Sequence, residues 1–332
     1  MDSARSAGTP DTVIWRPLDA SDAEAVVGLM REVESVDQEG RYLGDDMAQW
    51  LADPLQDLAR GSIAALDGDG IVAFATLRTG ELTGPLSDLR YTGTVRPDHR
   101  GRGFGARLLA WVPSGARALR EARQFPGGPI EIFASLAASN TDAARLHESF
   151  GYAAVRRFDR MTRRLDEPLP VVKPLDGVEI VPYSADRDEE ARRMKNEAFR
   201  EHWRSVPWSP ERWRSQAVGS PEFQAGLSFL ALDSGSGAVV GAVIVHHRAA
   251  QTEATGLRNA YVSSISTLHS HRGRGIAGTL LASVLNAAKS QGFDTSSLGV
   301  DAENRDRAAA VYEKAGYVTV SSRFAYSLTV AG

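Results

Sequence analysis

Residues 261–277 have the sequence YVSSISTLHSHRGRGIA, and this stretch decides the fold expected for the chain. Its first part, 261–268, is β-branched and apolar enough for a strand. A polar turn with two glycines follows at 269–275, and residues 276–291 then place apolar side chains at helical spacing. The expected order is therefore strand, glycine-rich turn, helix.

The glycine-rich turn is suited to hold a phosphate group. Unpaired backbone N–H groups at a helix start, together with the helix dipole, attract anions. Glycines let the backbone approach the anion without a Cβ in the way, and Arg272 and Arg274 add positive charge. A plain strand–helix connection and an RNA-binding Arg-Gly segment are alternatives, although the chain has no basic surplus. A dinucleotide or P-loop site lacks its third glycine and its lysine here.

The first half of the chain repeats this arrangement. Arg100-Gly101-Arg102-Gly103 precedes a helix that we expect from Ala106. Other segments recur in the same order: a short strand ending in proline, a hairpin and a Gly-Tyr strand start. The matching segments are 14–17 with 179–182, 63–74 with 229–242, 100–103 with 272–275, and 151–155 with 316–320. The linker 166–177 contains three prolines, which favour an extended chain. We therefore expect two domains, at about 12–166 and 177–330.

Both turns fit a known signature, in which Arg or Gln is followed by two residues, Gly, one residue, and Gly or Ala. The two matches are Arg100-Gly101-Arg102-Gly103-Phe104-Gly105 and Arg272-Gly273-Arg274-Gly275-Ile276-Ala277. Downstream, 298–304 (LGVDAEN) and 312–317 (YEKAGY) match the strand, Asn and helix end of the same family. The pattern resembles the GNAT superfamily of N-acetyltransferases, in a tandem two-domain form.

The resemblance implies an α/β (α+β) fold of two tandem domains, each with a mixed, mostly antiparallel central sheet flanked by helices. It also implies acetyl-CoA as cosubstrate, with its pyrophosphate in the turn and its pantetheine arm near Asn304. The backbone N–H of Leu268 or its neighbour is the implied oxyanion donor. The implied acetyl-CoA residues are Thr267, Leu268, His269, Arg272, Gly273, Arg274, Gly275, Ile276, Ala277 and Asn304 in the second copy, and Val95, Arg100, Gly101, Arg102, Gly103, Phe104 and Gly105 in the first.

Tyr312 is the candidate catalytic acid, because a phenol can donate a proton to a departing thiolate and the residue matches the tyrosine of the family. The alternative is a core aromatic on a helix. The first copy has His147 at this position and carries Pro113 inside its helix. We expect the second domain to be catalytic, and the first to be structural or to bind CoA unproductively.

No single general base stands out from the sequence. Glu201, His202, His246 and Glu253 are the candidates, and each also suits a surface or core position. The segment 196–213 holds three tryptophans, which either border an acceptor pocket or pack in the core.

Composition limits the partners. The 332 residues have a net charge of −4 and include no cysteine, so nucleic acid, disulfides and thiolate metal sites are not expected. We expect no metal, no membrane span or secretory signal, and a cytoplasmic location. A small-molecule amine is the expected acceptor, and the oligomeric state is undetermined. A non-catalytic acyl-CoA-binding or regulatory protein with the same fold is the alternative.

Overall fold

The computed structural model describes residues 13–40, 42, 44–53, 56–68, 70–79, 88–122 and 128–331, with the side chains of 44–46, 79, 88 and 304–308 outside the description. The chain divides into two compact units. Unit 1 contains the residues up to Arg156 together with those from Arg323 onward. Unit 2 contains Arg157–Ser322.

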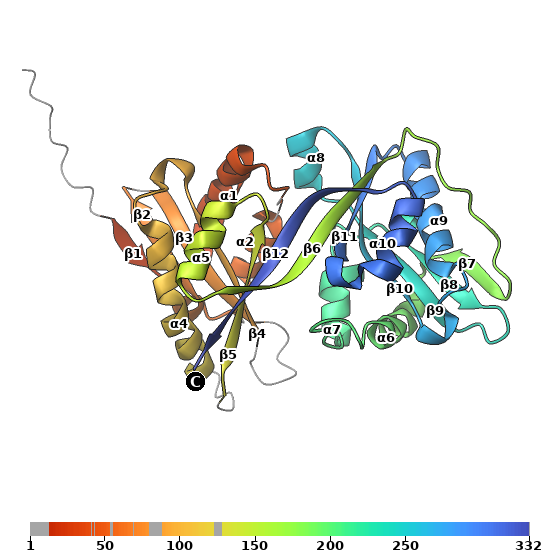
Figure 1. Cartoon of the computed structure of the whole chain (residues 1–332), viewed down its shortest axis with the longest axis horizontal. Helices are drawn as coiled ribbons and strands as arrows, with labels where there is room; N and C mark the ends of the chain where they lie inside the picture. Colours follow the sequence, from red (N-terminus) through yellow and green to blue (C-terminus); the bar gives the residue numbers. More distant parts are fainter. Residues whose placement is uncertain are drawn as a thin grey trace, which may run out of the picture. The chain divides into compact units, whose positions relative to one another are not determined.

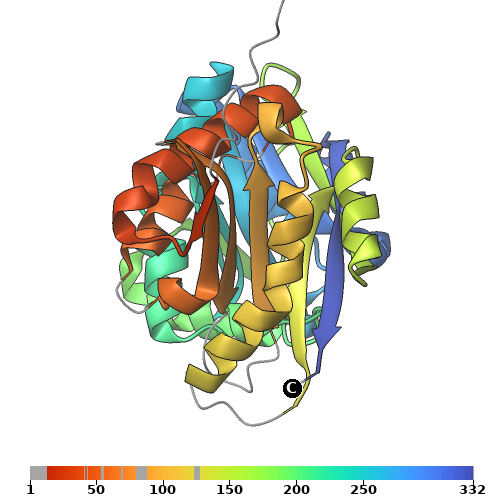
Figure 2. The same ribbon diagram turned by 90° about the vertical axis from the view of Figure 1, so that its left-hand side faces the viewer.

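Unit 1 is a mixed sheet with helices on both faces (Figures 1 and 2). Its strands run in the order β1-β2-β3-β4-β5-β12, and only the β4–β5 pair is parallel. The elements are β1 (Ile14–Arg16), α1 (Ala23–Asp37), α2 (Gly44–Ala52), α3 (Leu58–Gly61), β2 (Ser62–Asp67), β3 (Gly70–Thr79), β4 (Asp88–Val95), α4 (Phe104–Ala122), β5 (Ile130–Ala137), α5 (Thr141–Ser149), the start of β6 (Ala153–Arg164) and the end of β12 (Val318–Val330).

The central strand β3 is apolar and buried along 71–77, as expected for a strand covered on both faces. Helix α4 packs Leu108 and Val112 against one face. Helices α1 and α2 pack Val26 and Met47 against the other. The helix α4 continues through Pro113 to Ala122.

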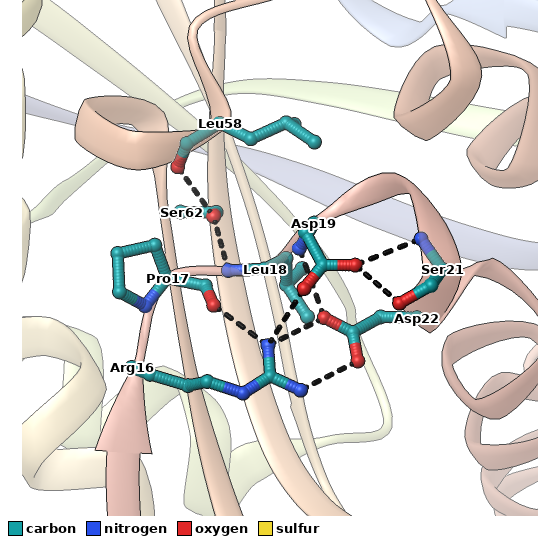
Figure 3. A network of polar contacts seen from close by, with 8 residues as sticks. All are labelled: Arg16, Pro17, Leu18, Asp19, Ser21, Asp22, Leu58 and Ser62. Carbon is teal, nitrogen blue, oxygen red and sulfur yellow. Dashed lines mark hydrogen bonds and ion pairs between the residues drawn. The ribbon is translucent and has the colours of Figure 1, made fainter.

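A polar network fixes the entry into α1 (Figure 3). The Arg16 guanidinium donates to both carboxylate oxygens of Asp22, at 2.6 and 2.7 Å. The Asp19 N–H donates to Asp22 at 2.9 Å. Ser62 Oγ accepts from the Leu18 N–H at 2.8 Å and donates to the Leu58 carbonyl at 2.7 Å. The Asp22 side chain is only 9% exposed, so this carboxylate holds the first turn and the strand end together.

We expect Asp22→Asn to lower the free energy of unfolding by about 1–3 kcal/mol at pH 7, because a hydrogen-bonded ion pair is lost from a buried carboxylate. The hydrogen bond from Arg16 lowers the pKa of Asp22. The stabilisation is therefore complete above the unfolded pKa of about 3.9 and is lost as the pH falls through the lower folded pKa. Urea unfolding at several pH values should show a weaker acid dependence in the variant. Asp142→Asn is the control, because that carboxylate is 91% exposed and should change stability little.

Unit 2 has the same plan, with its strands in the order β7-β8-β9-β10-β11-β6 and only the β10–β11 pair parallel (Figure 1). The elements are β7 (Val178–Pro182), α6 (Asp188–Ala198), α7 (Pro210–Trp213) with a π-helical turn (Arg214–Val218), β8 (Phe229–Asp233), β9 (Val239–His246), α8 (Ala249–Thr255), β10 (Asn259–Thr267), α9 (Ile276–Ser290), β11 (Thr295–Asp301) and α10 (Arg305–Lys314).

Strand β9 is buried throughout, and its alternate residues face different layers. Val243 and Val245 belong to the buried cluster that contains α9. Ala242 and Ile244 belong to the cluster that contains α6, Trp213 and Ala217. At Gly241 a Cβ would lie 3.0 Å from the Ile276 side chain, so the glycine lets the first residue of α9 approach the sheet closely.

The fold class expected from the sequence is confirmed, with two copies of a mostly antiparallel sheet between helices. The compact units differ from the sequence halves 12–166 and 177–330. Residues 158–164 of β6 pair with β11 in unit 2, and residues 323–330 of β12 pair with β5 in unit 1. Each unit is therefore completed by a strand from the other half of the sequence.

Candidate functional site

Strands β10 and β11 separate at their carboxyl ends. They pair in parallel only up to Val262 and Leu298, yet β10 runs on to Thr267 and β11 to Asp301. Beyond that point β10 keeps pairing with β9, and β11 keeps pairing with β6. The two facing edges therefore carry backbone groups without a partner in each other, which we call the β10–β11 opening.

The backbone directions in this opening follow from one hydrogen bond. The Leu268 N–H donates to the Val240 carbonyl at 2.9 Å, toward β9. The sequence names Leu268 or its neighbour as the oxyanion donor. The antiparallel ladder already uses the Leu268 N–H, so this half of the expectation is corrected, and the neighbouring N–H stays a prediction. Successive N–H groups of a strand point in opposite directions, so those of Thr267 and Ile265 point toward the opening. The Thr267 side-chain oxygen is buried and has no hydrogen-bond partner among the described residues.

The glycine-rich turn connects β10 to the start of α9. Gly273 and Gly275 have φ values of +77° and +84°, in the left-handed region that favours glycine. Gly275 is the N-cap of α9, and the first N–H groups of the helix therefore have no capping side chain. Ile276 is buried in the core, and Ala277 is half-buried, so these two residues offer their backbone rather than their side chains.

The arginines of the two turns have different partners. Arg272 donates to the carbonyls of Thr267 and Ala198, at 3.4 and 3.1 Å. Arg274 donates to the Asp176 carbonyl at 2.7 Å. In unit 1, Arg100 instead forms a two-pronged ion pair with Asp37, at 2.7 and 2.8 Å. Arg272 and Arg274 thus bond to neutral carbonyls, whereas Arg100 of unit 1 is neutralised by a carboxylate.

Tyr312 of α10 is buried in the cluster that contains Val262 and Leu298, the last paired residues of the two strands. Burial raises the pKa of Tyr312 to about 12, so the phenol stays protonated at neutral pH. Its ring contacts that of Tyr317 edge-on at 6.4 Å. The Tyr317 hydroxyl is within 2.7 Å of Ser296 Oγ, which fixes the neighbouring ring.

Two stretches of the chain match known family models. Residues 59–154 match the model described as "Acetyltransferase (GNAT) domain", and residues 189–317 match the model described as "Acetyltransferase (GNAT) family". A mycothiol acetyltransferase of Thermobispora bispora is 31% identical over 76% of this chain and 78% of the relative. The chain belongs to the GNAT acetyltransferase family. The expectation of a tandem GNAT N-acetyltransferase is thereby confirmed.

Other GNAT relatives share the full length. A mycothiol acetyltransferase of Streptomyces scabiei is 25% identical over 98% of this chain and 97% of its own. The solved GCN5-related N-acetyltransferase of Sphaerobacter thermophilus has a TM-score of 0.75, is 25% identical, and is matched over 97% of both chains. A tandem GNAT protein from the clavulanic acid biosynthesis pathway has a TM-score of 0.70 at 15% identity, over 96% of this chain and 99% of its own, and shares the fold.

The His147 position of unit 1 differs in chemistry from Tyr312. His147 Nδ1 lies 2.7 Å from the Ala143 carbonyl, which can only accept, so the ring hydrogen is on Nδ1. Nε2 is buried and has no partner among the described residues. Burial lowers the pKa of His147, which keeps the imidazole neutral at pH 7. The free ring nitrogen therefore has no proton to donate.

In unit 1, two other residues of the expected site take part in packing contacts. Gly101 and Gly103 have φ values of +74° and +87°, as in unit 2. Phe104 instead packs its ring against Trp15 and His99, each at 5.8 Å. A Cβ at Gly105 would lie 3.0 Å from the Leu146 side chain, which places this glycine where α4 approaches α5. Val95 pairs with β3 at the end of its strand, and Arg102 is exposed.

The base candidates fall in different environments. Glu201 and Glu253 are exposed, and the His202 ring packs on Phe199 at 4.4 Å. His246 is buried, with Nδ1 2.9 Å from Ser263 Oγ and Nε2 2.9 Å from the Ala217 carbonyl. The sequence did not single out Ser263, because a residue left out of a strand ladder gives no signal in a single sequence.

Two tryptophans of the segment 196–213 have internal partners. Trp213 is buried in the core, and the Trp208 ring lies under the Lys195 ammonium at 3.5 Å and the Arg212 guanidinium at 4.4 Å. The core interpretation therefore holds for Trp213. Asn304, expected at the pantetheine arm, lies outside the residues whose side chains are described.

Among the residues that the structure describes, no three His, Asp or Glu side chains gather as a metal site. Within the same residues, no helix is long and apolar enough to cross a membrane.

Proposed function

We propose that unit 2 transfers an acetyl group from acetyl-CoA directly to the primary amine of a small molecule, in the cytoplasm. The observation that carries this proposal is the alignment of three features along β10: the β10–β11 opening, the glycine-rich turn at its end, and the buried Tyr312 at its start. A thioester in the opening would have its phosphates at the turn and its sulfur near a protonated phenol.

The turn suits the pyrophosphate of acetyl-CoA. The uncapped N-terminus of α9 offers N–H groups and a positive helix dipole to an anion. Arg272 and Arg274 bond to neutral backbone carbonyls, and these partners do not offset either positive charge. In unit 1, Asp37 offsets the charge of Arg100, so we assign the tighter CoA site to unit 2.

The chemistry needs two further groups. Charge builds on the thioester oxygen as the amine attacks, and the Thr267 and Ile265 N–H groups face the opening where that oxygen would lie. The C–S bond then breaks, and Tyr312 gives its proton to the departing thiolate. No covalent enzyme intermediate is needed, which suits a chain without cysteine.

The acceptor we propose is a small soluble amine, and the names of the relatives give the first compound to test. The relatives are named mycothiol acetyltransferases, so the unacetylated form of mycothiol is the first acceptor to test. We expect CoA release with at least one amine of a panel of desacetylmycothiol, glucosamine and tyramine, followed as free thiol. Turnover confined to a peptide with a free N-terminus would contradict a small-molecule acceptor.

The same assay distinguishes the enzyme from the alternative, a non-catalytic acyl-CoA-binding protein. An acyl-CoA-binding protein without enzyme activity would bind acetyl-CoA in calorimetry yet release no CoA with any amine. The protonated, buried Tyr312 favours the enzyme, because a binding protein needs no proton donor at the sulfur.

A further inference from the structure

Strand β10 carries an extra residue that its unit 1 counterpart lacks. The β9–β10 ladder shifts register between Val262 and Ser264, so Ser263 has no partner on β9. The β3–β4 ladder keeps one register from Thr79 to Ala73. Such bulges re-aim a side chain and are frequent next to active sites. Here the bulge lies where β10 leaves β11.

The re-aimed side chain is bonded to a buried histidine. Ser263 is exposed, and its Oγ lies 2.9 Å from Nδ1 of His246, which is 5% exposed. His246 Nε2 lies 2.9 Å from the Ala217 carbonyl, which can only accept, so Nε2 carries the ring hydrogen. Nδ1 therefore presents a lone pair to the Ser263 hydroxyl. The hydroxyl also reaches the Ile244 carbonyl at 3.1 Å, so it has two hydrogen-bond orientations.

His246 and Tyr312 lie on opposite faces of the unit 2 sheet. His246 follows Ile244 by two residues on β9 and so faces the layer of α6, Trp213 and Ala217. Tyr312 belongs to the opposite cluster, with α9. A thioester held in the β10–β11 opening would then have the phenol on one side and the Ser263 hydroxyl on the other.

We infer that Ser263 and His246 form the proton relay that deprotonates the attacking amine; this inference rests on the proposed function of unit 2. The amine nitrogen bonds to the acetyl carbon and gives its proton to Ser263 Oγ, as the Ser263 proton moves to His246 Nδ1. The C–S bond breaks, and Tyr312 protonates the thiolate. The imidazolium keeps its Nε2–H bond to the Ala217 carbonyl. Solvent then returns one proton from His246 to Tyr312, which balances the cycle.

In this relay Ser263 is the catalytic residue, because it meets the amine, and His246 is a positioning residue that acts through it. The arrangement also accounts for the difference between the units. Unit 1 has neither the bulge nor a proton on the free nitrogen of His147.

The test uses the full chain with acetyl-CoA and the amine panel of the preceding section. We expect Ser263→Ala to lower kcat about 100-fold while leaving the KM for acetyl-CoA unchanged. Ser263→Thr, which keeps the hydroxyl, should retain most of the activity. His246→Gln should fall as far as Ser263→Ala, and the double variant no further, because the two groups act as one unit.

The matched control is His247→Gln. His247 is the next residue, but its ring packs on Phe293 at 5.2 Å, away from Ser263. This variant should keep wild-type kcat. Equal activity of Ser263→Ala and wild type would overturn the relay while leaving the acetyltransferase intact. A wild-type protein that acetylates no amine would instead contradict the proposed function itself.

Discussion

Replacing Gly275 with glutamate is expected to weaken acetyl-CoA binding about 100-fold or more, equivalent to about 2.8 kcal/mol. Gly275 has a φ of +84°, which strains any residue with a Cβ. The new carboxylate would also stand at the N-terminus of α9, where the pyrophosphate is proposed to bind, and would repel it. Isothermal titration with acetyl-CoA measures the loss, and circular dichroism checks that the variant is folded.

Gly103→Glu is the matched control in unit 1, because Gly103 has a nearly identical φ of +87° at the equivalent position. We expect this variant to change the affinity for acetyl-CoA at the tighter site little. Gly275→Ala should fall between wild type and Gly275→Glu, since it adds strain without charge. If Gly103→Glu were the damaging change, the tighter CoA site would belong to unit 1. Unchanged affinity in both variants would remove the turn from the site.

Replacing Tyr312 with phenylalanine is expected to lower kcat about 100-fold while leaving the affinity for acetyl-CoA unchanged. The ring stays in the core, so the loss reports the hydroxyl alone. The raised pKa, about 12, keeps Tyr312 protonated, and an acid acts in its protonated form. Deprotonation of Tyr312 should therefore not reduce kcat until the pH approaches that value. The Tyr312→Phe variant should likewise show no additional loss of kcat at alkaline pH.

His147→Ala is the matched variant for unit 1, and we expect little change in kcat. His147 has its hydrogen on Nδ1, bonded to the Ala143 carbonyl, and no proton on Nε2. Because the side chain is buried, unfolding should be measured alongside activity. A large loss of kcat in a folded His147→Ala variant would transfer the chemistry to unit 1.

Much of the fold could be predicted from local sequence signals. The stretch 261–277 combined a β-branched run, two glycines and a helical spacing, and the structure has β10, the turn and α9 in those places. Whether a segment forms a helix or a strand depends largely on nearby residues. The repeated sequence pattern was therefore enough to predict two similar units.

The features that escaped prediction depend on pairing between distant segments. Residues 158–164 and 323–330 follow the same Gly-Tyr signal in both halves, so nothing local tells which sheet each strand joins. The Leu268 N–H and the Ser263 bulge depend on the register with β9, and register is a property of two strands rather than one. His246 could not be separated from the other three base candidates for this reason, since its contact with Ser263 depends on the bulge.

Each unit takes one strand segment from the other half of the sequence, and this exchange has a consequence for evolution. A mutation that deletes either half of the gene also removes a strand that the other unit's sheet needs. A cut in the linker 166–177 would leave each fragment without the sixth strand of its sheet. The incomplete sheet would then expose an edge strand with unpaired backbone groups, which favours aggregation. If unit 2 alone is catalytic, as proposed, selection could relax the chemistry of unit 1, whereas loss of that half of the chain would take strand β6 from the sheet of unit 2.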